Sequence, residues 1–412
     1  MGKTIPAGAL TPDIAQSFDI RHLPAGFLDN PYPFYHLLRQ FDPVHRCPDG
    51  SYFLTRYDDL ALIYRDPRMS SDKKIEFKPK FGDGALYTHH TTSLVFNDPP
   101  LHTRVRRLIA GALTPRALKA LEPQLIALID RLLDRAQDMG RFDLIEDFAS
   151  AIPIEVIGDL LGVPHEDRGP LRNWSLTVLG ALEPVITPEQ LAIGNKSVED
   201  FRDYLVGLIA ERRRNPRDVE SDVLSRLIAG EADGSRLTEE ELLQNCIFLL
   251  NAGHETTTNL IGNGIAALID WPEEQALLRR DPELIKPAVE EFLRFESSNQ
   301  LGNRMTTAEI SFGDVTLPAG SFLTLCIGGA NRDPAQFPDP DRLDITRSPN
   351  RHLAFGGGIH ACAGMSLARM EGQIAIGRLI RRFAKIEPAG PYLRGGRARF
   401  RGYLNYPLSI SG

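Results

Sequence analysis

A single cysteine follows a glycine-rich run and comes just before a helical pattern over 365–383. The run is Phe355–Gly364, FGGGIHACAG, in which Cys362 is the cysteine. A helix start presents unpaired N–H groups and a partial positive charge, and both stabilise a thiolate. Glycines let the backbone approach a flat ligand closely. Cys362 is therefore predicted to be either a nucleophile or a metal ligand.

An acid and a threonine lie side by side in an apolar helical pattern over 239–268. Glu255 and Thr256 follow Ala252 and Gly253, and two more threonines come next. Glycine and threonine are poor helix formers, and a buried carboxylate is costly. The composition predicts a locally opened helix whose acid and hydroxyl hold water and relay protons. The alternative is that the threonine hydroxyls bond to carbonyls of the preceding turn.

Two other pairs place charged side chains one helical turn apart. Glu291 and Arg294 share a helix face and can form an ion pair, although most such pairs are solvated. His102 and Arg106 suit the binding of carboxylates or phosphates. The alternative for the second pair is a basic surface turn.

The composition is that of a globular protein, with 42% hydrophobic and 25% charged residues among 412. A net charge of −7 argues against general nucleic-acid binding. Four dispersed cysteines without a CxxC pair predict reduced thiols and a cytoplasmic location. No stretch of 18 apolar residues is present, so we expect no membrane span.

Helical patterns dominate, with a small β portion, so we expect a mainly α fold with small β-sheets (α+β). The helical patterns cover 117–137, with a break at Pro123, and 153–161, 198–213, 223–229, 239–268 and 283–295. A hairpin over 309–317, a strand over 321–327 and a strand pair near 51–55 and 60–64 are predicted, the last segment being helical in the alternative. The chain is expected to be one domain, 1–412, with a short flexible N-terminus over about 1–20.

The order of these motifs resembles the cytochrome P-450 superfamily, in particular its soluble bacterial members. The acid–threonine helix is followed by Glu291–Arg294 (EFLR), then by Asn331–Pro334 (NRDP) and FGGGIHACAG. The cysteine motif F-G-x-G-x-H-x-C-x-G is matched at every defined position. The resemblance extends from about residue 31 to the C-terminus.

The resemblance implies a P-450 fold, with haem b (iron protoporphyrin IX) held between the long central helix and the cysteine loop. Cys362 is the implied axial iron ligand. The other implied cofactor-binding residues are His102, Arg106, Arg304, Phe355, Gly356, His360, Gly364 and Ala252. Glu255 and Thr256 are the implied catalytic pair for dioxygen activation. Glu291 and Arg294 are implied to be structural, joined by Asn331–Asp344.

The implied reaction is insertion of one oxygen atom into a mainly apolar small molecule, by hydroxylation or epoxidation. The implied pocket residues are Phe81, Leu86, Tyr87, Leu94, Phe248, Asn251, Asn299, Gln300 and Leu301. Asn251, Asn299 and Gln300 are polar where the family is usually apolar. They predict either an anchor for a polar substrate group or bonds to the backbone. In the 77–94 loop, His89 and His90 are expected to be exposed polar residues.

Electrons are implied to come from NAD(P)H through a separate ferredoxin and ferredoxin reductase, and the substrate is either free or carrier-bound. Six arginines are expected either to dock that partner or to be solvated: Arg104, Arg107, Arg351, Arg378, Arg381 and Arg382. A peroxide-driven peroxygenase and a non-catalytic haem protein are the alternatives, and neither needs the acid–threonine pair. A zinc site would need more ligands than His360 and Cys362 supply.

Overall fold

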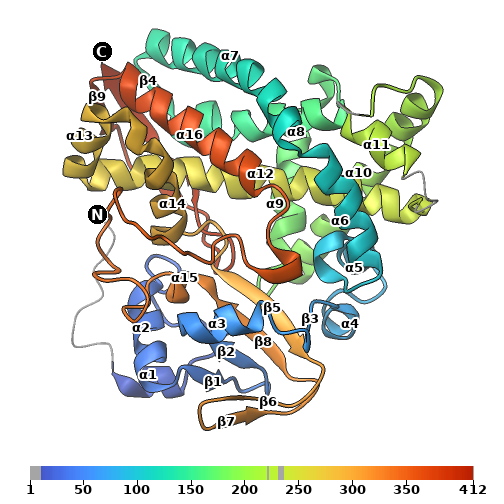
Figure 1. Cartoon of the computed structure of the whole chain (residues 1–412), viewed down its shortest axis with the longest axis vertical. Coiled ribbons are helices and arrows are strands. Elements are labelled where there is room, and N and C mark those ends of the chain that lie inside the picture. The colour runs from blue at the N-terminus through green and yellow to red at the C-terminus, as the bar shows by residue number, and fades with distance from the viewer. Residues whose placement is uncertain (1–10, 220–221, 231–235, 412) are drawn as a thin grey trace.

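The computed structural model describes residues 11–219, 222–230 and 236–411. Figure 1 shows the long helices gathered in one half of the molecule and the largest sheet in the other. The long helices are α7 (Pro115–Met139), α10 (Pro188–Arg214), α12 (Glu239–Asp270) and α16 (Met365–Arg382). The shorter ones are α1 (Pro12–Gln16), α2 (Tyr32–Phe41), α3 (Tyr57–Ile63), α4 (Lys74–Phe81), α5 (Ala85–Thr92), α6 (Leu101–Ala112), α8 (Ala151–Leu161), α9 (Leu171–Gly180), α11 (Val223–Ala229), α13 (Pro272–Arg280), α14 (Ile285–Phe295) and α15 (Ile327–Ala330).

The largest sheet has five strands in the order β1 (Val44–Arg46), β2 (Tyr52–Leu54), β8 (Phe322–Cys326), β5 (Leu301–Thr306) and β3 (Met69–Ser70). Only β2 and β8 are parallel. The three smaller sheets are β4 (Arg141–Asp143), β12 (Pro407–Ser411) and β9 (Lys385–Pro388); β6 (Ile310–Phe312) and β7 (Val315–Leu317); and β10 (Leu393–Arg394) and β11 (Tyr403–Asn405). The mainly α fold with small sheets is therefore confirmed.

The central helix α12 begins at a strong local signal and is buried along most of its length. The hydroxyl of Thr238 accepts from the backbone N–H of Glu241, and the Glu241 carboxylate accepts from the N–H of Thr238. This reciprocal cap satisfies two N–H groups that the helix would otherwise leave unpaired. The helix packs against α8, α9 and α16. It therefore forms a rigid support for Glu255 and Thr256.

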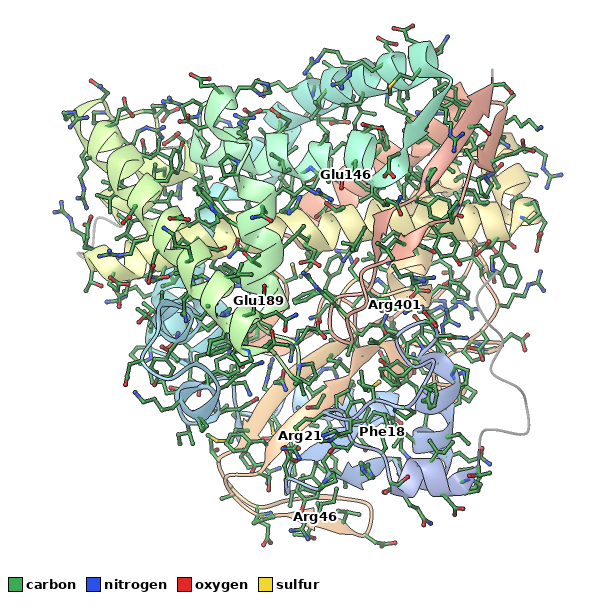
Figure 2. All side chains as sticks on the ribbon, turned by 180° about the vertical axis from the view of Figure 1, so that it is seen from behind. Phe18, Arg21, Arg46, Glu146, Glu189 and Arg401 are labelled. Carbon is green, nitrogen blue, oxygen red and sulfur yellow. The ribbon has the colours of Figure 1, made fainter. Side chains whose placement is uncertain are left out.

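The segment after β10 joins the two halves of the molecule. The backbone oxygen of Arg401 accepts from Asn263 of α12, while its guanidinium donates to the carbonyls of Leu28 and Asp29. Figure 2 shows Arg401 between α12 and the N-terminal part of the chain, with Phe18 and Arg21 near the sheet. The N-terminal and C-terminal segments are thus fixed to each other beside the central helix.

Several predicted boundaries are wrong. Helix α7 contains Pro123 without a break, because packing against α16 outweighs the roughly 3 kcal/mol that proline costs inside a helix. Helix α10 begins at Pro188 instead of 198, capped by Thr187 and Gln190. Segment 60–64 lies mostly in α3, so the helical alternative is confirmed for it. The predicted strand near 51–55 is β2, which pairs with β1 and β8 instead of with segment 60–64.

Two further predictions, for the N-terminus and for the 77–94 loop, also need correction. Residues 1–10 of the predicted flexible N-terminus lie outside the described residues. Beyond them, Phe18 is buried and packs on Phe27 and Phe53. The predicted loop over 77–94 is largely helical, since it contains the end of α4 and all of α5. His89 and His90 are buried instead of exposed.

Candidate active site

The acid of the predicted pair is buried on α12 and bound by an arginine from the segment after β10. Glu255 Oε1 accepts a hydrogen bond from Arg397 Nη1 at 2.7 Å. Burial raises the pKa of Glu255 to about 7, although Arg397 acts to lower it. Glu255 Oε2 has no hydrogen-bond partner among the described residues. An acid with a pKa near neutrality can both release and take up a proton.

A small polar cavity lies against this ion pair. Its volume is about 20 Å³, which is enough for one water molecule. Glu255, Arg397, His254 and Asn259 are among the residues that line it. Both ring nitrogens of His254 and the amide nitrogen of Asn259 lack a hydrogen-bond partner in the described part of the chain. The cavity therefore has the donors and acceptors that a proton-carrying water needs.

The threonine of the pair bonds to its own helix. Thr256 Oγ1 donates to the carbonyl of Ala252 at 2.8 Å, and Thr258 Oγ1 donates to the carbonyl of His254 at 3.1 Å. Helix α12 is unbroken from Glu239 to Asp270. The predicted local opening is therefore wrong, and the alternative of bonds to the preceding turn is observed. Such bonds satisfy the hydroxyls while the main-chain ladder remains intact.

The cysteine loop is folded against the end of α3. The backbone N–H of Cys362 donates to the carbonyl of Phe355 at 2.9 Å. Gly356 and Gly358 have φ angles of 64° and 62°, a conformation that favours glycine. A Cβ at Gly358 would lie 2.0 Å from the carbonyl oxygen of Tyr64. The close approach of Tyr64 therefore requires glycine at position 358, independently of any ligand.

Gly364 and Cys362 occupy a different environment. A Cβ added at Gly364 would meet no other atom of the described chain within 4 Å, so protein packing does not explain the glycine. Burial raises the pKa of the Cys362 thiol, and a backbone hydrogen bond involving Gly364 opposes it, as do Arg106 and Arg369. Desolvation is the larger effect, and it opposes the stabilisation of a thiolate that the helix start provides. A bound cation at the sulfur would favour the thiolate.

Four cationic or N–H-bearing side chains meet beside the cysteine loop. The His102 and His360 rings lie 4.1 Å apart between centroids. Nε2 of each ring is buried and has no hydrogen-bond partner among the described residues. Burial lowers the pKa of His360 to about 3, with Arg304, His102 and Arg106 acting in the same direction. Two carboxylates placed here would supply the missing acceptors and negative charge, so the group fits the two propionates of a haem.

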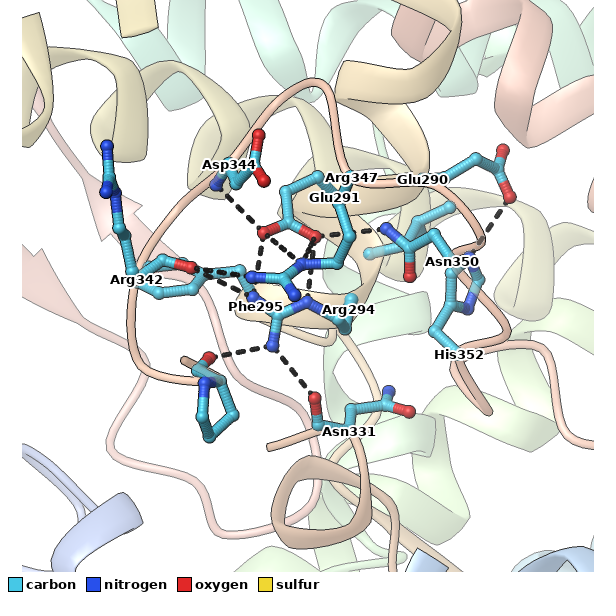
Figure 3. Close-up of polar contacts among 12 residues, drawn as sticks. Glu290, Glu291, Arg294, Phe295, Asn331, Arg342, Asp344, Arg347, Asn350 and His352 are labelled. Carbon is cyan, nitrogen blue, oxygen red and sulfur yellow. Dashed lines mark hydrogen bonds and ion pairs between the residues drawn. The ribbon is translucent and has the colours of Figure 1, made fainter. Parts of the chain in front are cut away.

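The predicted Glu291–Arg294 pair is a buried network and not a solvated contact (Figure 3). Arg294 Nε and Nη2 donate to the two oxygens of Glu291 at 2.7 and 2.8 Å. The remaining donors of Arg294 reach the carbonyls of Asn331 and Pro340 at 3.0 and 2.7 Å. Glu291 also accepts from the backbone N–H of Asp344 at 3.0 Å. The pair therefore ties the 331–350 segment to α14.

A neighbouring carboxylate, which the sequence interpretation did not single out, continues the network toward the cysteine loop. Glu290 accepts from His352 Nε2 at 3.1 Å and from Arg369 Nε at 2.7 Å. Although burial raises the pKa of Glu290, these two partners lower it to about 2. The Arg369 guanidinium lies 4.7 Å from the ring centroid of Phe355. Glu290 directly precedes Glu291 on α14, and this position is the feature of the sequence from which its role could have been predicted.

Some predicted pocket residues lie near the centre of α12 or against it. Phe81 and Leu94 are buried in the main apolar cluster, and Phe248 is half-buried on α12. Asn251 accepts from the hydroxyl of Ser175 at 3.0 Å, so its oxygen joins α12 to α9. Asn299 pairs through its backbone with Phe400, and its side-chain oxygen has no partner among the described residues.

Four predicted pocket residues make contacts with other parts of the chain. Leu86 lies where a Cβ on Gly194 of α10 would contact it, and the Tyr87 hydroxyl donates to the carbonyl of Lys74. Gln300 donates to the carbonyl of Ser297 at 2.7 Å, so the backbone-bond alternative applies to it. Leu301 packs in the cluster that contains Phe53 and Cys326. Strand alternation sends Leu301 away from the face that carries Arg304.

Three of the arginines predicted to dock a partner form ion pairs with carboxylates of this chain. Arg104, Arg378 and Arg382 pair with Glu241, Asp130 and Asp134. These ion pairs favour the solvated-face alternative for the three residues. Arg351 is exposed.

The described residues contain neither a cluster of metal-binding side chains nor a membrane-spanning helix. Within 11–219, 222–230 and 236–411, no cluster of three or more His, Cys, Asp or Glu side chains could hold a metal ion. Over the same residues, the structure contains no helix with the length and apolar character needed to cross a membrane.

Comparisons with known proteins agree with this geometry. The family model described as Cytochrome P450 matches residues 182–390. The chain is 42% identical over 358 residues to vitamin D(3) 25-hydroxylase of Pseudonocardia autotrophica, covering 86% of each protein. The crystal structure of P450BioI in complex with hexadec-9Z-enoic acid ligated acyl carrier protein matches with a TM-score of 0.88 and 37% identity, over 93% of this chain and 99% of that one.

A myxobacterial P450, CYP267B1 in complex with myristic acid, matches with a TM-score of 0.86 and 35% identity over 98% and 100% of the two chains. These likenesses extend over nearly the whole chain, and they include the α12 centre, the Glu291–Arg294 network and the cysteine loop. The chain belongs to the cytochrome P450 family of haem-containing monooxygenases.

Proposed function

We propose that this enzyme inserts one atom of dioxygen into a mainly apolar small organic molecule, by hydroxylation or epoxidation, on a haem bound through Cys362. The haem, when bound, supplies the oxidising chemistry. The observation that carries the proposal is the contact of His102 with His360, whose unpartnered ring nitrogens lie beside the cysteine loop. His102, His360, Arg106 and Arg304 would bind the propionates.

The chain's own residues would complete the haem site on the side of the cysteine loop and on the side of α12. Phe355, Gly356 and Gly364 would contact the haem from the cysteine loop, and the small Ala252 would leave room beside Thr256 on α12. Glu255 would receive protons through the cavity that it shares with Arg397 and transfer them toward the Thr256 hydroxyl. Both alternatives, the peroxygenase and the non-catalytic haem protein, leave this acid–threonine pair unexplained.

The absorbance spectrum of the reduced, carbon-monoxide-bound protein tests the Cys362 assignment. The wild-type protein should show the red-shifted band of a thiolate ligand, and Cys362→Ser should lose that band at equal haem content. A wild-type spectrum without the band would contradict the assignment. Peroxide supporting the same turnover rate as the electron-transfer partners would favour the peroxygenase alternative.

The substrate class follows from the relatives. One acts on vitamin D(3), one is seen with an acyl carrier protein carrying hexadec-9Z-enoic acid, and one with myristic acid. We propose a mainly apolar substrate for this chain also, either free or attached to a carrier protein. Displacement of the iron-bound water, seen as a spin-state shift, would report binding. A shift with the free molecule alone would contradict the carrier-bound form.

The remaining proposals concern the electron source, the cellular location and the domain organisation of the enzyme. We propose that electrons come from NAD(P)H through a separate ferredoxin reductase and ferredoxin, in the cytoplasm. We also propose one catalytic domain over 1–412, because a single buried apolar cluster contains residues from Phe77 to Leu408. Turnover with a ferredoxin system, measured as product formed per NAD(P)H oxidised, tests the electron source.

A further inference from the structure

Two lysines of the α4 region, Lys73 buried and Lys80 half-buried, lie close to an arginine from the segment after β10. Lys73 Nζ is 2.5 Å from Glu76 Oε2, and only 1% of its side chain is exposed. Lys80 Nζ donates to the backbone carbonyl of Glu183 at 2.5 Å. The charge of Arg399 acts on both lysines. We call these three cations the Lys73–Lys80–Arg399 group.

Arg399 is held by neutral acceptors. Its Nε donates to the carbonyl of Leu182 at 3.1 Å, Nη1 donates to the carbonyl of Leu301 at 2.9 Å, and Nη2 donates to the amide oxygen of Asn303. These acceptors satisfy the N–H groups but carry no net charge. They also place the guanidinium against β5, beside the Asn303 side chain, which by strand alternation lies on the face opposite to Arg304 of the proposed haem site.

The charges in this region do not balance. Glu76 is paired with Lys73, and Glu183 accepts from the backbone N–H groups of Ala398 and Arg399 at 2.7 and 3.1 Å. Two carboxylates therefore face three cations among the described residues. Burial lowers the pKa of Lys80 to about 8, and Arg399 acts in the same direction. Lys80 and Arg399 are half-buried, and a charge partly removed from solvent without a counter-ion is costly, so a further anion would stabilise the group.

The surroundings of Lys80 are aromatic. Its Nζ lies 5.2 Å from the ring centroid of Phe81, which is 5.2 Å from the ring of Phe77 and 5.4 Å from that of His90. His90 is buried, and burial holds its pKa well below the ordinary value, so this ring adds no further positive charge. An apolar surface beside an unbalanced cation suits a molecule with an apolar body and one anionic end.

We propose that the substrate carries a carboxylate, which binds to Arg399 and Lys80 while its apolar part extends toward the haem. This inference rests on the proposed function and names its substrate class. It assigns Lys80 and Arg399 as specificity-determining residues. The neutral acceptors around Arg399 allow its guanidinium to turn toward the anion without leaving a carboxylate unpaired.

The test compares charged and neutral probes that are anchored in the same way. We would titrate the haem-loaded enzyme with ω-(imidazol-1-yl)alkanoic acids of several chain lengths and with their methyl esters. The imidazole ligates the iron in both series, and the shift of the haem band reports the Kd. For at least one chain length, the acid should bind about tenfold or more tightly than its ester. Lys80→Met should reduce that ratio to less than about threefold by weakening the acid alone.

Lys78→Met is the matched control, since Lys78 lies on the same helix with 49% of its side chain exposed and pairs with Asp83. It should keep the wild-type ratio. Arg399→Lys retains the charge, and it should keep a preference for the acid even if packing changes. Equal binding of acid and ester at every length, or an unchanged ratio in Lys80→Met, would overturn the proposal. Failure of both series to shift the haem band would instead contradict the proposed haem site.

Discussion

Arg397 Nη1 lies 2.7 Å from Glu255 Oε1, so the acid of the central helix is paired with a cation from the C-terminal segment. The same guanidinium donates to the carbonyl of Leu176 on α9 and lines an open cleft of about 470 Å³. The pair therefore stands between that cleft and the polar cavity beside α12. Movement of one side chain would change both the acidity of Glu255 and its access to water.

Replacing Arg397 with glutamine should shift the pH dependence of turnover upward. Burial already raises the pKa of Glu255 from 4.5 to about 7, and Arg397 is the main opposing influence. Without it the carboxyl should stay protonated to higher pH, moving the apparent pKa of kcat by about one unit or more. The pH–rate profile measures this. Arg21→Gln, which changes an arginine in the same cleft, is the control, and an unmoved profile in Arg397→Gln would disprove the coupling.

Thr256→Ala should separate dioxygen consumption from product formation. Its hydroxyl is the one next to Glu255, and within the described part of the chain it donates to the Ala252 carbonyl. Product per NAD(P)H oxidised should fall at least about tenfold, with more peroxide released. Thr91→Ala removes an equivalent bond, to the carbonyl of Tyr87 on α5, and should leave the yield unchanged. Equal yields in the two variants would show that Thr256 has no special part in proton transfer.

Glu291→Gln should destabilise the protein and reduce its haem content. The carboxylate is fully buried and neutralises Arg294 while accepting from Asp344 and Asn350. Breaking a buried ion pair costs about 3–5 kcal/mol, because the remaining charge has no partner. Urea unfolding and the ratio of haem to protein absorbance measure the two effects. Glu283→Gln, at an exposed position just before α14, should change neither quantity.

Glu371→Gln should stabilise the protein at alkaline pH. Glu371 is 2% exposed on α16, and burial raises its pKa from 4.5 to about 8. The folded state thus binds this proton more tightly than the unfolded chain does. The linked stability is fully present below pH 4.5 and is lost as the pH rises to about 8, by up to about 1.4 kcal/mol per pH unit.

Urea midpoints at pH 6 and pH 9 would measure the effect. The glutamine variant should lack this part of the alkaline loss, whereas Glu273→Gln, at an exposed position, should follow the wild type. An identical loss in wild type and Glu371→Gln would contradict the assignment.

The sequence was most informative where function requires a fixed local pattern. The cysteine loop could be recognised because Cys362, His360 and the glycines are neighbours, and α12 because Thr238 and Glu241 form a local cap. The side to which a strand or helix residue points depends on distant partners. Leu301 and Leu86 were therefore assigned to a pocket, although each packs against another element.

The same limit applies to residues that reach the site from far along the chain. Arg397 and Arg399 belong to an arginine-rich run that resembles a solvated segment, and only the fold brings them to Glu255 and to β5. The Pro123 prediction failed for a related reason. Local propensity predicts a break, but the surface of α16 stabilises the continuous helix.

The contact of Gly358 with the carbonyl of Tyr64 has a consequence for synthesis and folding. Tyr64 follows α3 near the start of the chain, whereas Gly358 is made only near its end. A contact between such remote positions forms late, because a long loop must close first. The nascent chain should therefore acquire its finished cysteine loop, and become able to capture haem there, only after the segment around Gly358 has left the ribosome.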